Sequence, residues 1–212
     1  MLQRPQRFLI ALVAATVLLT GCFTGERPTL TPRSPIDDPA ADAVLSRLEG
    51  ADAVDFIAHY DIIPTLSGAT TTSATVAQLG ARRRISIGDV VYSTDGNESR
   101  TCQNGVDECA DFLDDARISD LGITHMFWGS AFGARLELDA SRRIGPSSGA
   151  STTIAGQVAA CVDVIVPSVA ATAGTVVYCA LDAGVLARYL GADVSIELTS
   201  FTFGVSPIDL GG

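Results

Sequence analysis

The segments VAACVDVIV (residues 158–166) and TVVYCAL (residues 175–181) decide the fold of this chain. In both segments apolar side chains recur at alternate positions, which is the pattern of a β-strand with one buried face. If the strands run antiparallel with Cys161 opposite Cys179, then Val162 lies opposite Tyr178. The apolar faces of the two strands then coincide, as the register of a buried sheet requires. The pair therefore predicts an antiparallel hairpin.

Strand and helix patterns continue from this hairpin toward both ends of the chain. Other short segments also carry apolar residues at alternate positions. The dipeptide Asp95-Gly96 is a strong signal for a β-hairpin turn. Residues 106–140 instead carry apolar side chains at helical spacing, in one stripe at 106–116 and another at 127–138. This order predicts an α+β fold in which a curved antiparallel β-sheet, a half-barrel, wraps around a helical insert. The predicted elements are a helix at 39–50, strands at 54–62, 70–79, 83–87, 90–94, 158–166, 176–180, 185–189 and 194–203, a loop at 145–149, and a bulge or twist near Thr199.

The composition is that of a globular protein with an acidic surface. Hydrophobic residues make up 47% of the 212 residues, and the formal net charge is −10. An acidic chain is repelled by nucleic acid and by anionic membrane surfaces, so we expect neither as a partner. Nothing after the N-terminal region is apolar for long enough to form a transmembrane helix.

The N-terminus has the features of a bacterial export signal. Arg4 and Arg7 precede an apolar run that ends in Leu-Thr-Gly-Cys22. The run is shorter than the roughly 20 residues that span a membrane, so it is typical of a signal peptide. Its end resembles the lipobox, the recognition site of lipoprotein signal peptidase, which implies a lipid, palmitate among its acyl chains, on Cys22. We therefore expect a lipoprotein signal peptide at 1–21, a flexible tether at 22–38 and a half-barrel domain at 39–212, anchored on the extracytoplasmic face of the cell membrane.

The other four cysteines fit an exported domain. Such cysteines are normally oxidised, and the natural pairing is Cys102 with Cys109 and Cys161 with Cys179. A zinc site needs Cys or His ligands at tighter spacing than the sequence provides. The sequence therefore predicts two disulfides, with neither a metal nor another cofactor.

The order of elements behind a lipobox resembles the actinobacterial lipoproteins of the LprG and LppX type, which are similar in fold to LolA and LolB. The local features that carry this resemblance are Ala155-Gly156, Cys161, Tyr178-Cys179 and the Asp182-Ala-Gly-Val-Leu turn. It implies a membrane-anchored carrier whose curved sheet encloses a lipid, a glycolipid or another acylated ligand. The residues expected to line that cavity are Phe56, Tyr60, Phe127, Trp128, Phe132, Val162, Val164, Val176, Tyr178, Val194 and Ile196. Gly122, Gly129 and Gly133 are the expected flexible points of a lid formed by the insert.

Two other functions stay open at this point. The same residues could form an ordinary packed core, in which case the protein is a non-catalytic envelope module that works through protein contacts. A hydrolase is the second alternative, but no catalytic constellation surrounds His59 or His125, so we expect no enzyme. The acidic run at 107–120 reads as a solvated helix face rather than a Ca²⁺ site. The run Arg82-Arg83-Arg84 could bind phosphate or lipid headgroups, although such runs more often lie at a solvent-exposed strand end.

Overall fold

The computed structural model describes residues 36–65, 70–96, 98–105, 108–168, 174–206 and 210. These residues belong to one compact unit that starts at Pro35. The predicted signal peptide, Cys22 and most of the predicted tether lie outside the described residues. No helix among the described residues is long and apolar enough to cross a membrane.

Helix α2 (Pro39–Leu48) opens the domain, as predicted. The Asp38 carboxylate caps it by accepting hydrogen bonds from the backbone N–H groups of Ala40 and Ala41, at 3.2 and 3.1 Å. Asp38 is buried, and Ile36 packs against the core. The folded domain therefore begins before residue 39, and the last residues of the predicted tether are part of it.

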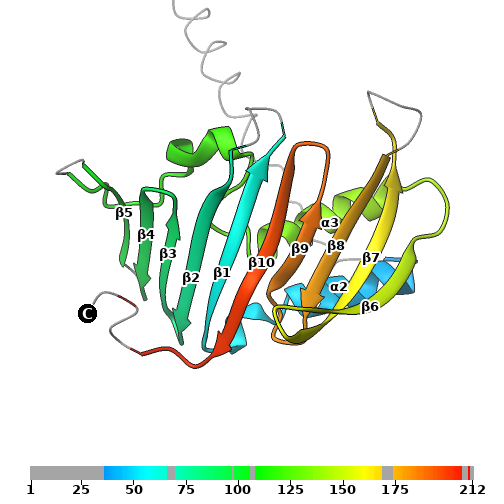
Figure 1. Cartoon of the computed structure of the whole chain (residues 1–212), viewed down its shortest axis with the longest axis horizontal. Helices are drawn as coiled ribbons and strands as arrows, with labels where there is room; N and C mark the ends of the chain where they lie inside the picture. The colour runs from blue at the N-terminus through cyan, green and yellow to red at the C-terminus, as the bar shows by residue number, and fades with distance from the viewer. Residues whose placement is uncertain are drawn as a thin grey trace, which may run out of the picture. The chain divides into compact units, whose positions relative to one another are not determined.

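Ten antiparallel strands form one open sheet in the order β5-β4-β3-β2-β1-β10-β9-β8-β7-β6 (Figure 1). The helices lie on one side of it, so the described domain is α+β, as predicted. The strands are β1 (Phe56–Pro64), β2 (Thr72–Leu79), β3 (Arg82–Ile87), β4 (Val90–Asp95), β5 (Glu98–Gln103), β6 (Ser148–Ile154), β7 (Gln157–Val166), β8 (Gly174–Leu181), β9 (Leu186–Leu190) and β10 (Val194–Phe203).

The sheet consists of two meanders joined at one seam. Strands β1 to β5 form the first meander, β6 to β10 form the second, and β1 pairs with β10 between them. The chain between β5 and β6 leads from one edge of the sheet to the other and contains η2 (Asp115–Leu121) and α3 (Ser130–Ser141). With α2 and the short helix η1 (Ala51–Ala53), this insert covers the inner face of the sheet, where the core lies.

The register predicted from the sequence is confirmed. Cys161 lies opposite Cys179, and Val162 opposite Tyr178. Both predicted disulfides are present, Cys102–Cys109 and Cys161–Cys179. The pairing of β1 with β10 shifts by one residue between His59 and Tyr60, so Thr199 has no paired residue opposite it in β1. The bulge is therefore where the change of apolar parity in β10 predicted it.

Two expectations for the middle of the chain are wrong. The helical stripe expected at 106–116 is absent from residues 108–114; instead Ala110 forms a β-bridge with Thr101, and the Cys102–Cys109 disulfide closes the loop between them. Strand β6 starts inside the expected loop at 145–149. Its side chains are exposed except at its last residue, so it has no alternating apolar pattern to reveal it.

Candidate functional site

An aromatic layer fills the space between the insert and strand β1. The ring of Phe127 meets the ring of Tyr60 edge-on, with centroids 5.0 Å apart. Trp128 meets Phe56 in the same way at 5.5 Å. All four side chains are at most 1% exposed. The segment 122–129, which joins η2 to α3, thus seals the inner face of β1.

Two polar atoms in this layer have no hydrogen-bond partner among the described residues. They are the hydroxyl oxygen Oη of Tyr60 and the indole nitrogen Nε1 of Trp128. Burial raises the pKa of Tyr60 well above its usual value, so the hydroxyl keeps its proton and remains a donor. A buried donor without an acceptor typically costs about 1–3 kcal/mol. The layer therefore contains two buried donors that no described residue accepts from.

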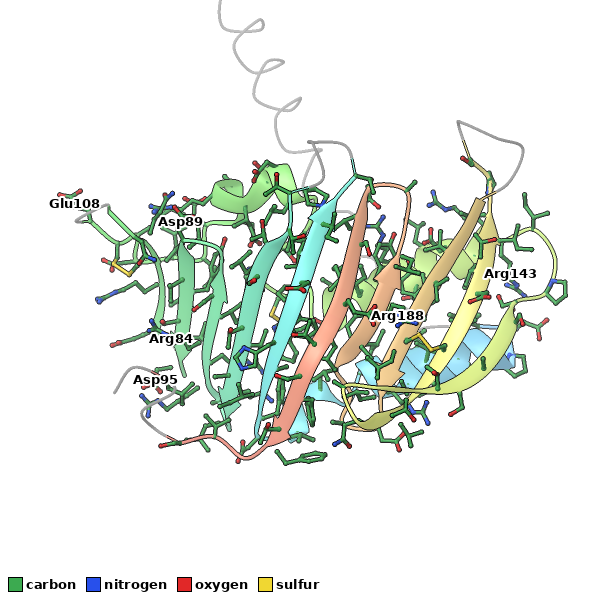
Figure 2. The ribbon with its side chains drawn as sticks, in the orientation of Figure 1. Arg84, Asp89, Asp95, Glu108, Arg143 and Arg188 are labelled. Atoms are coloured by element: carbon green, nitrogen blue, oxygen red, sulfur yellow. A yellow bond between two sulfur atoms is a disulfide. The ribbon has the colours of Figure 1, made fainter. Side chains whose placement is uncertain are left out.

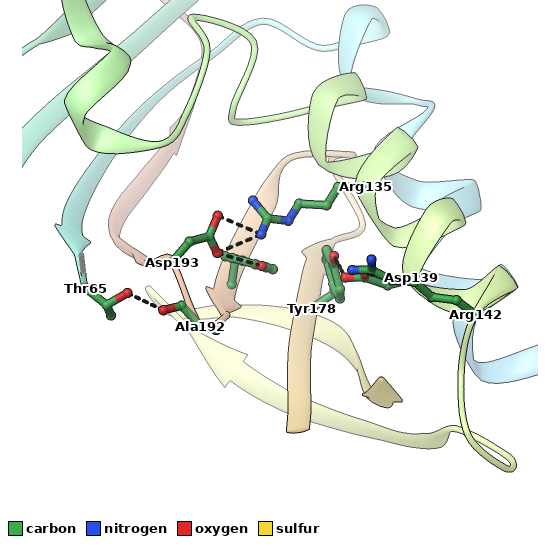
Figure 3. Close-up of polar contacts among 8 residues, drawn as sticks. Thr65, Arg135, Asp139, Arg142, Tyr178, Ala192 and Asp193 are labelled. Atoms are coloured by element: carbon green, nitrogen blue, oxygen red, sulfur yellow. Dashed lines mark hydrogen bonds and ion pairs between the residues drawn. The ribbon is translucent and has the colours of Figure 1, made fainter. Parts of the chain in front are cut away.

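Helix α3, by contrast, is tied to the sheet by satisfied polar contacts (Figure 3). The Tyr178 hydroxyl donates to the buried carboxylate of Asp139 at 2.5 Å, and Arg142 donates to the same carboxylate at 2.6 Å. Burial, and then the Asp139 carboxylate, raise the pKa of Tyr178. Nearer the start of the helix, Arg135 donates to both Asp193 oxygens at 2.7 and 2.8 Å.

The residues predicted to line a cavity lie together. All of them are at most 8% exposed and belong to one core cluster beneath the helices. Phe132 extends the aromatic contacts from the insert to Tyr189, at 4.7 Å. An open volume among these residues stays a prediction. Of the three predicted flexible glycines, Gly133 instead packs inside α3, where an added Cβ would lie 3.4 Å from Leu45.

The histidines have structural partners. The Nδ1 atom of His59 lies 3.0 Å from the Thr75 hydroxyl. His125 lies 2.9 Å from the Asp115 carboxylate and stacks on Tyr92 at 5.4 Å. A hydrolytic triad also needs a nucleophilic hydroxyl on the histidine, and the ring contacts of His125 within the described residues are those two. No group of three or more His, Cys, Asp or Glu in the described part of the chain could hold a metal.

Strand β3 divides the predicted basic run between the two faces of the sheet. Arg83 lies on the inner face, where its Cζ is 5.5 Å from the Trp128 ring centroid and its Nε donates to Gln78 at 2.7 Å. Arg82 and Arg84 therefore lie on the outer face, because side chains alternate along a strand. The run is not a single basic surface. The alternation of the β3 sequence could have predicted this division.

Comparison with known proteins gives likeness in fold alone. No protein-family model and no curated protein sequence matches the chain. Solved structures that resemble it include LprF from Mycobacterium bovis, with 15% identity, a TM-score of 0.41, and coverage of 82% of this chain and 97% of that one. MucB in complex with MucA has 13% identity, a TM-score of 0.43, and coverage of 79% and 57%. A LolA superfamily protein from Nitrosomonas europaea has 9% identity, a TM-score of 0.36, and coverage of 80% and 96%.

The identities to these three structures are 9–15%, and the TM-scores are all below 0.5. At such low identity the structures describe an architecture, and the function of this chain has to come from its own geometry.

Proposed function

We propose that this chain is an exported, lipid-anchored protein that holds an apolar or acylated molecule between its insert and the inner face of its sheet. The observation that carries the proposal is the pair of unused donors, Tyr60 Oη and Trp128 Nε1, in the aromatic layer. A carboxyl or ester group would supply the kind of acceptor that each donor lacks among the described residues, while its acyl chain would replace ring contacts with other apolar contacts. The binding energy would then come mainly from apolar area, at about 25 cal/mol per Å², and the donors would orient the ligand.

The segment 122–129 is the part of the insert that we expect to move for such a ligand. It carries Phe127 and Trp128 and begins at Gly122, whose φ of 69° is in the left-handed region that favours glycine. Helix α3, in contrast, is held by the Asp139 and Arg135 contacts. The proposed entrance therefore lies between η2 and the start of α3.

Tyr60→Phe tests this proposal. Without ligand, removal of an unpaired buried hydroxyl is expected to raise the free energy of unfolding by about 1 kcal/mol. The affinity for a dansyl-labelled fatty acid should fall by about 5- to 10-fold, because one hydrogen bond to the carboxyl group is lost. Urea denaturation of the ligand-free protein and a fluorescence titration measure the two effects separately.

Tyr92→Phe is the matched control. The Tyr92 hydroxyl is also on the inner face but donates to the Asp114 carbonyl at 3.1 Å. Its removal should lower the free energy of unfolding by about 1 kcal/mol and leave fatty-acid affinity unchanged. If the parent protein binds no fatty acid and Tyr60→Phe only stabilises it, the carrier proposal fails. The packed envelope module, which the close ring contacts also favour, would then stand.

The proposed anchor has a test of its own. Cys22→Ala removes the thiol that accepts the lipid, so the protein is expected to move from the membrane fraction to the soluble fraction. Stable anchoring takes about two acyl chains, and no other anchor is proposed. Fractionation with an immunoblot measures the change, and the size of the chain shows whether the signal peptide was removed. A processed Cys22→Ala protein that stays in the membrane would contradict the anchor.

A further inference from the structure

A cavity opens on the first meander. Its volume is about 740 Å³, and β3, β4 and β5 form its floor. Its lining is polar apart from Leu210 and the half-cystine Cys102. The cavity contacts Arg82, Arg83, Arg84, Ser93, Thr94, Asp95, Glu98, Ser99, Arg100, Cys102, Asp111 and Leu210. A cavity of this size and polarity suits a charged ligand group rather than an acyl chain.

Strand pairing places three donors of the lining in one row. Arg84 pairs with Ser93 on β4, and Ser93 pairs with Arg100 on β5. Paired residues point to the same face, and this is the outer face, opposite the one on which Arg83 meets Trp128. Neighbouring strands lie about 4.8 Å apart, so the Cα atoms of the two arginines are about 10 Å apart. Two arginine side chains reach a single anion across that distance, with the serine hydroxyl between them.

The acidic residues of the cavity leave this row largely free. Asp95 pairs with Arg82 at 3.3 Å, outside the row. Asp111 lies 3.8 Å from Arg100, but the side chains are 90% and 62% exposed, which makes the contact weak. Glu98 lies in the row of Arg82, opposite Asp95. Arg84 forms no ion pair with a carboxylate among the described residues. Its guanidinium is therefore the cation in the lining whose charge is least compensated.

The wall beside this row is fixed before any ligand arrives. The Cys102–Cys109 disulfide and the bridge between Thr101 and Ala110 hold the chain that leads to Asp111 against β5. The Thr101 hydroxyl donates to the Phe112 carbonyl at 2.7 Å. A preformed wall lowers the ordering cost of binding. This loop is the one that replaced the helix expected there.

We propose that the row Arg84–Ser93–Arg100 binds a phosphate group of a phosphorylated ligand. Guanidinium groups match the oxygens of phosphate with paired hydrogen bonds, and a hydroxyl donor between two of them suits a tetrahedral anion. The cavity has room for the organic part of a phosphate ester beyond the anion. The ligand is either a soluble phosphate ester or the headgroup of an anionic phospholipid. The site lies on the opposite face of the sheet from the acyl site proposed above and does not depend on it.

The test is a calorimetric titration of the full chain in phosphatidylcholine-containing micelles with sn-glycerol 3-phosphate. The parent protein should bind it saturably, and Arg84→Gln should weaken binding by about tenfold or more. Arg84→Lys should weaken binding less, because it keeps the charge but loses the paired geometry. Arg188→Gln is the matched control and should bind as the parent does. Arg188 also lies on the sheet but on the second meander, paired with Glu197 at 2.6 Å (Figure 2).

The two sources of phosphate are separated by repeating the titration in micelles that contain phosphatidylglycerol. If a phospholipid headgroup is the ligand, the added lipid competes and lowers the apparent affinity for glycerol phosphate in the parent protein. If the ligand is a soluble ester, the affinity is unchanged. Both outcomes support the site. The proposal is overturned if the parent protein binds neither probe, if Arg84→Gln binds as tightly as the parent, or if Arg188→Gln loses as much affinity as Arg84→Gln.

Discussion

Gly184→Ala is expected to lower the free energy of unfolding by about 3 kcal/mol or more. Gly184 lies in the turn between β8 and β9, with a φ of 85°. An added Cβ would overlap the backbone nitrogen of Ala51 and would lie 2.7 Å from the carbonyl carbon of Gly50. Backbone strain of about 1–3 kcal/mol and overpacking of about 1–3 kcal/mol therefore act together. Urea denaturation monitored by the single tryptophan measures the change.

Gly80→Ala isolates the strain from the packing. Gly80 also has a positive φ, 57°, but an added Cβ there would meet nothing within 4 Å. The expected loss is about 1–2 kcal/mol, the strain of a left-handed residue alone. Equal losses at the two positions would show that the turn does not lie against Gly50 and Ala51. The comparison therefore tests how closely the second meander packs on the link between α2 and β1.

Replacing both Cys161 and Cys179 by alanine is expected to lower the free energy of unfolding by about 3 kcal/mol. The disulfide closes a loop across a sequence separation of 18, which restricts the unfolded chain. Alanine suits the site because the two residues are 8% and 1% exposed. The expected value is an upper one, since the entropy of loop closure is its only source. Chemical denaturation of oxidised parent and double variant gives the difference.

The other disulfide provides the comparison. Cys102 and Cys109 are separated by 7 residues, and the same loop-entropy relation gives about 2.5 kcal/mol for their double alanine variant. This change should also weaken binding of glycerol phosphate, because Cys102 lines the phosphate cavity. The Cys161/Cys179 variant should leave that binding intact as long as it is folded. A larger stability loss at Cys102/Cys109 would contradict the loop-entropy account.

The sequence predicted the sheet well wherever one face of a strand is apolar. The pairing of Cys161 with Cys179 followed from matching apolar faces, and the bulge at Thr199 followed from a change in parity. The same physics explains the missed strand. β6 lies at the edge of the sheet, and six of its seven residues are exposed, so burial imposed no pattern on its sequence.

The helix expected at 106–116 failed for a different reason. Apolar residues at Ala110 and Leu113 have helical spacing, but the disulfide and the bridge to Thr101 impose an extended return toward β5. A tertiary constraint thus overrode a local pattern. The two proposed sites differ in how far the sequence alone could predict them. The division of Arg82, Arg83 and Arg84 between faces follows from strand alternation, whereas the unpaired hydroxyl of Tyr60 depends on neighbours from the distant insert.

The central seam of the sheet has a consequence for the order of folding. Strand β10 comes last in the chain yet lies in the middle of the sheet, between β1 and β9. Each meander can grow by adding adjacent strands, but the seam joins strands at opposite ends of the domain, so its loop-closure entropy is the largest in the fold. Until β10 is available, one edge of β1 stays unpaired, and its apolar residues Phe56, Ile57 and Ala58 form a template for intermolecular association. We therefore expect docking of β10 to be the slow, committing step, and a chain released without its last strand to aggregate rather than to fold.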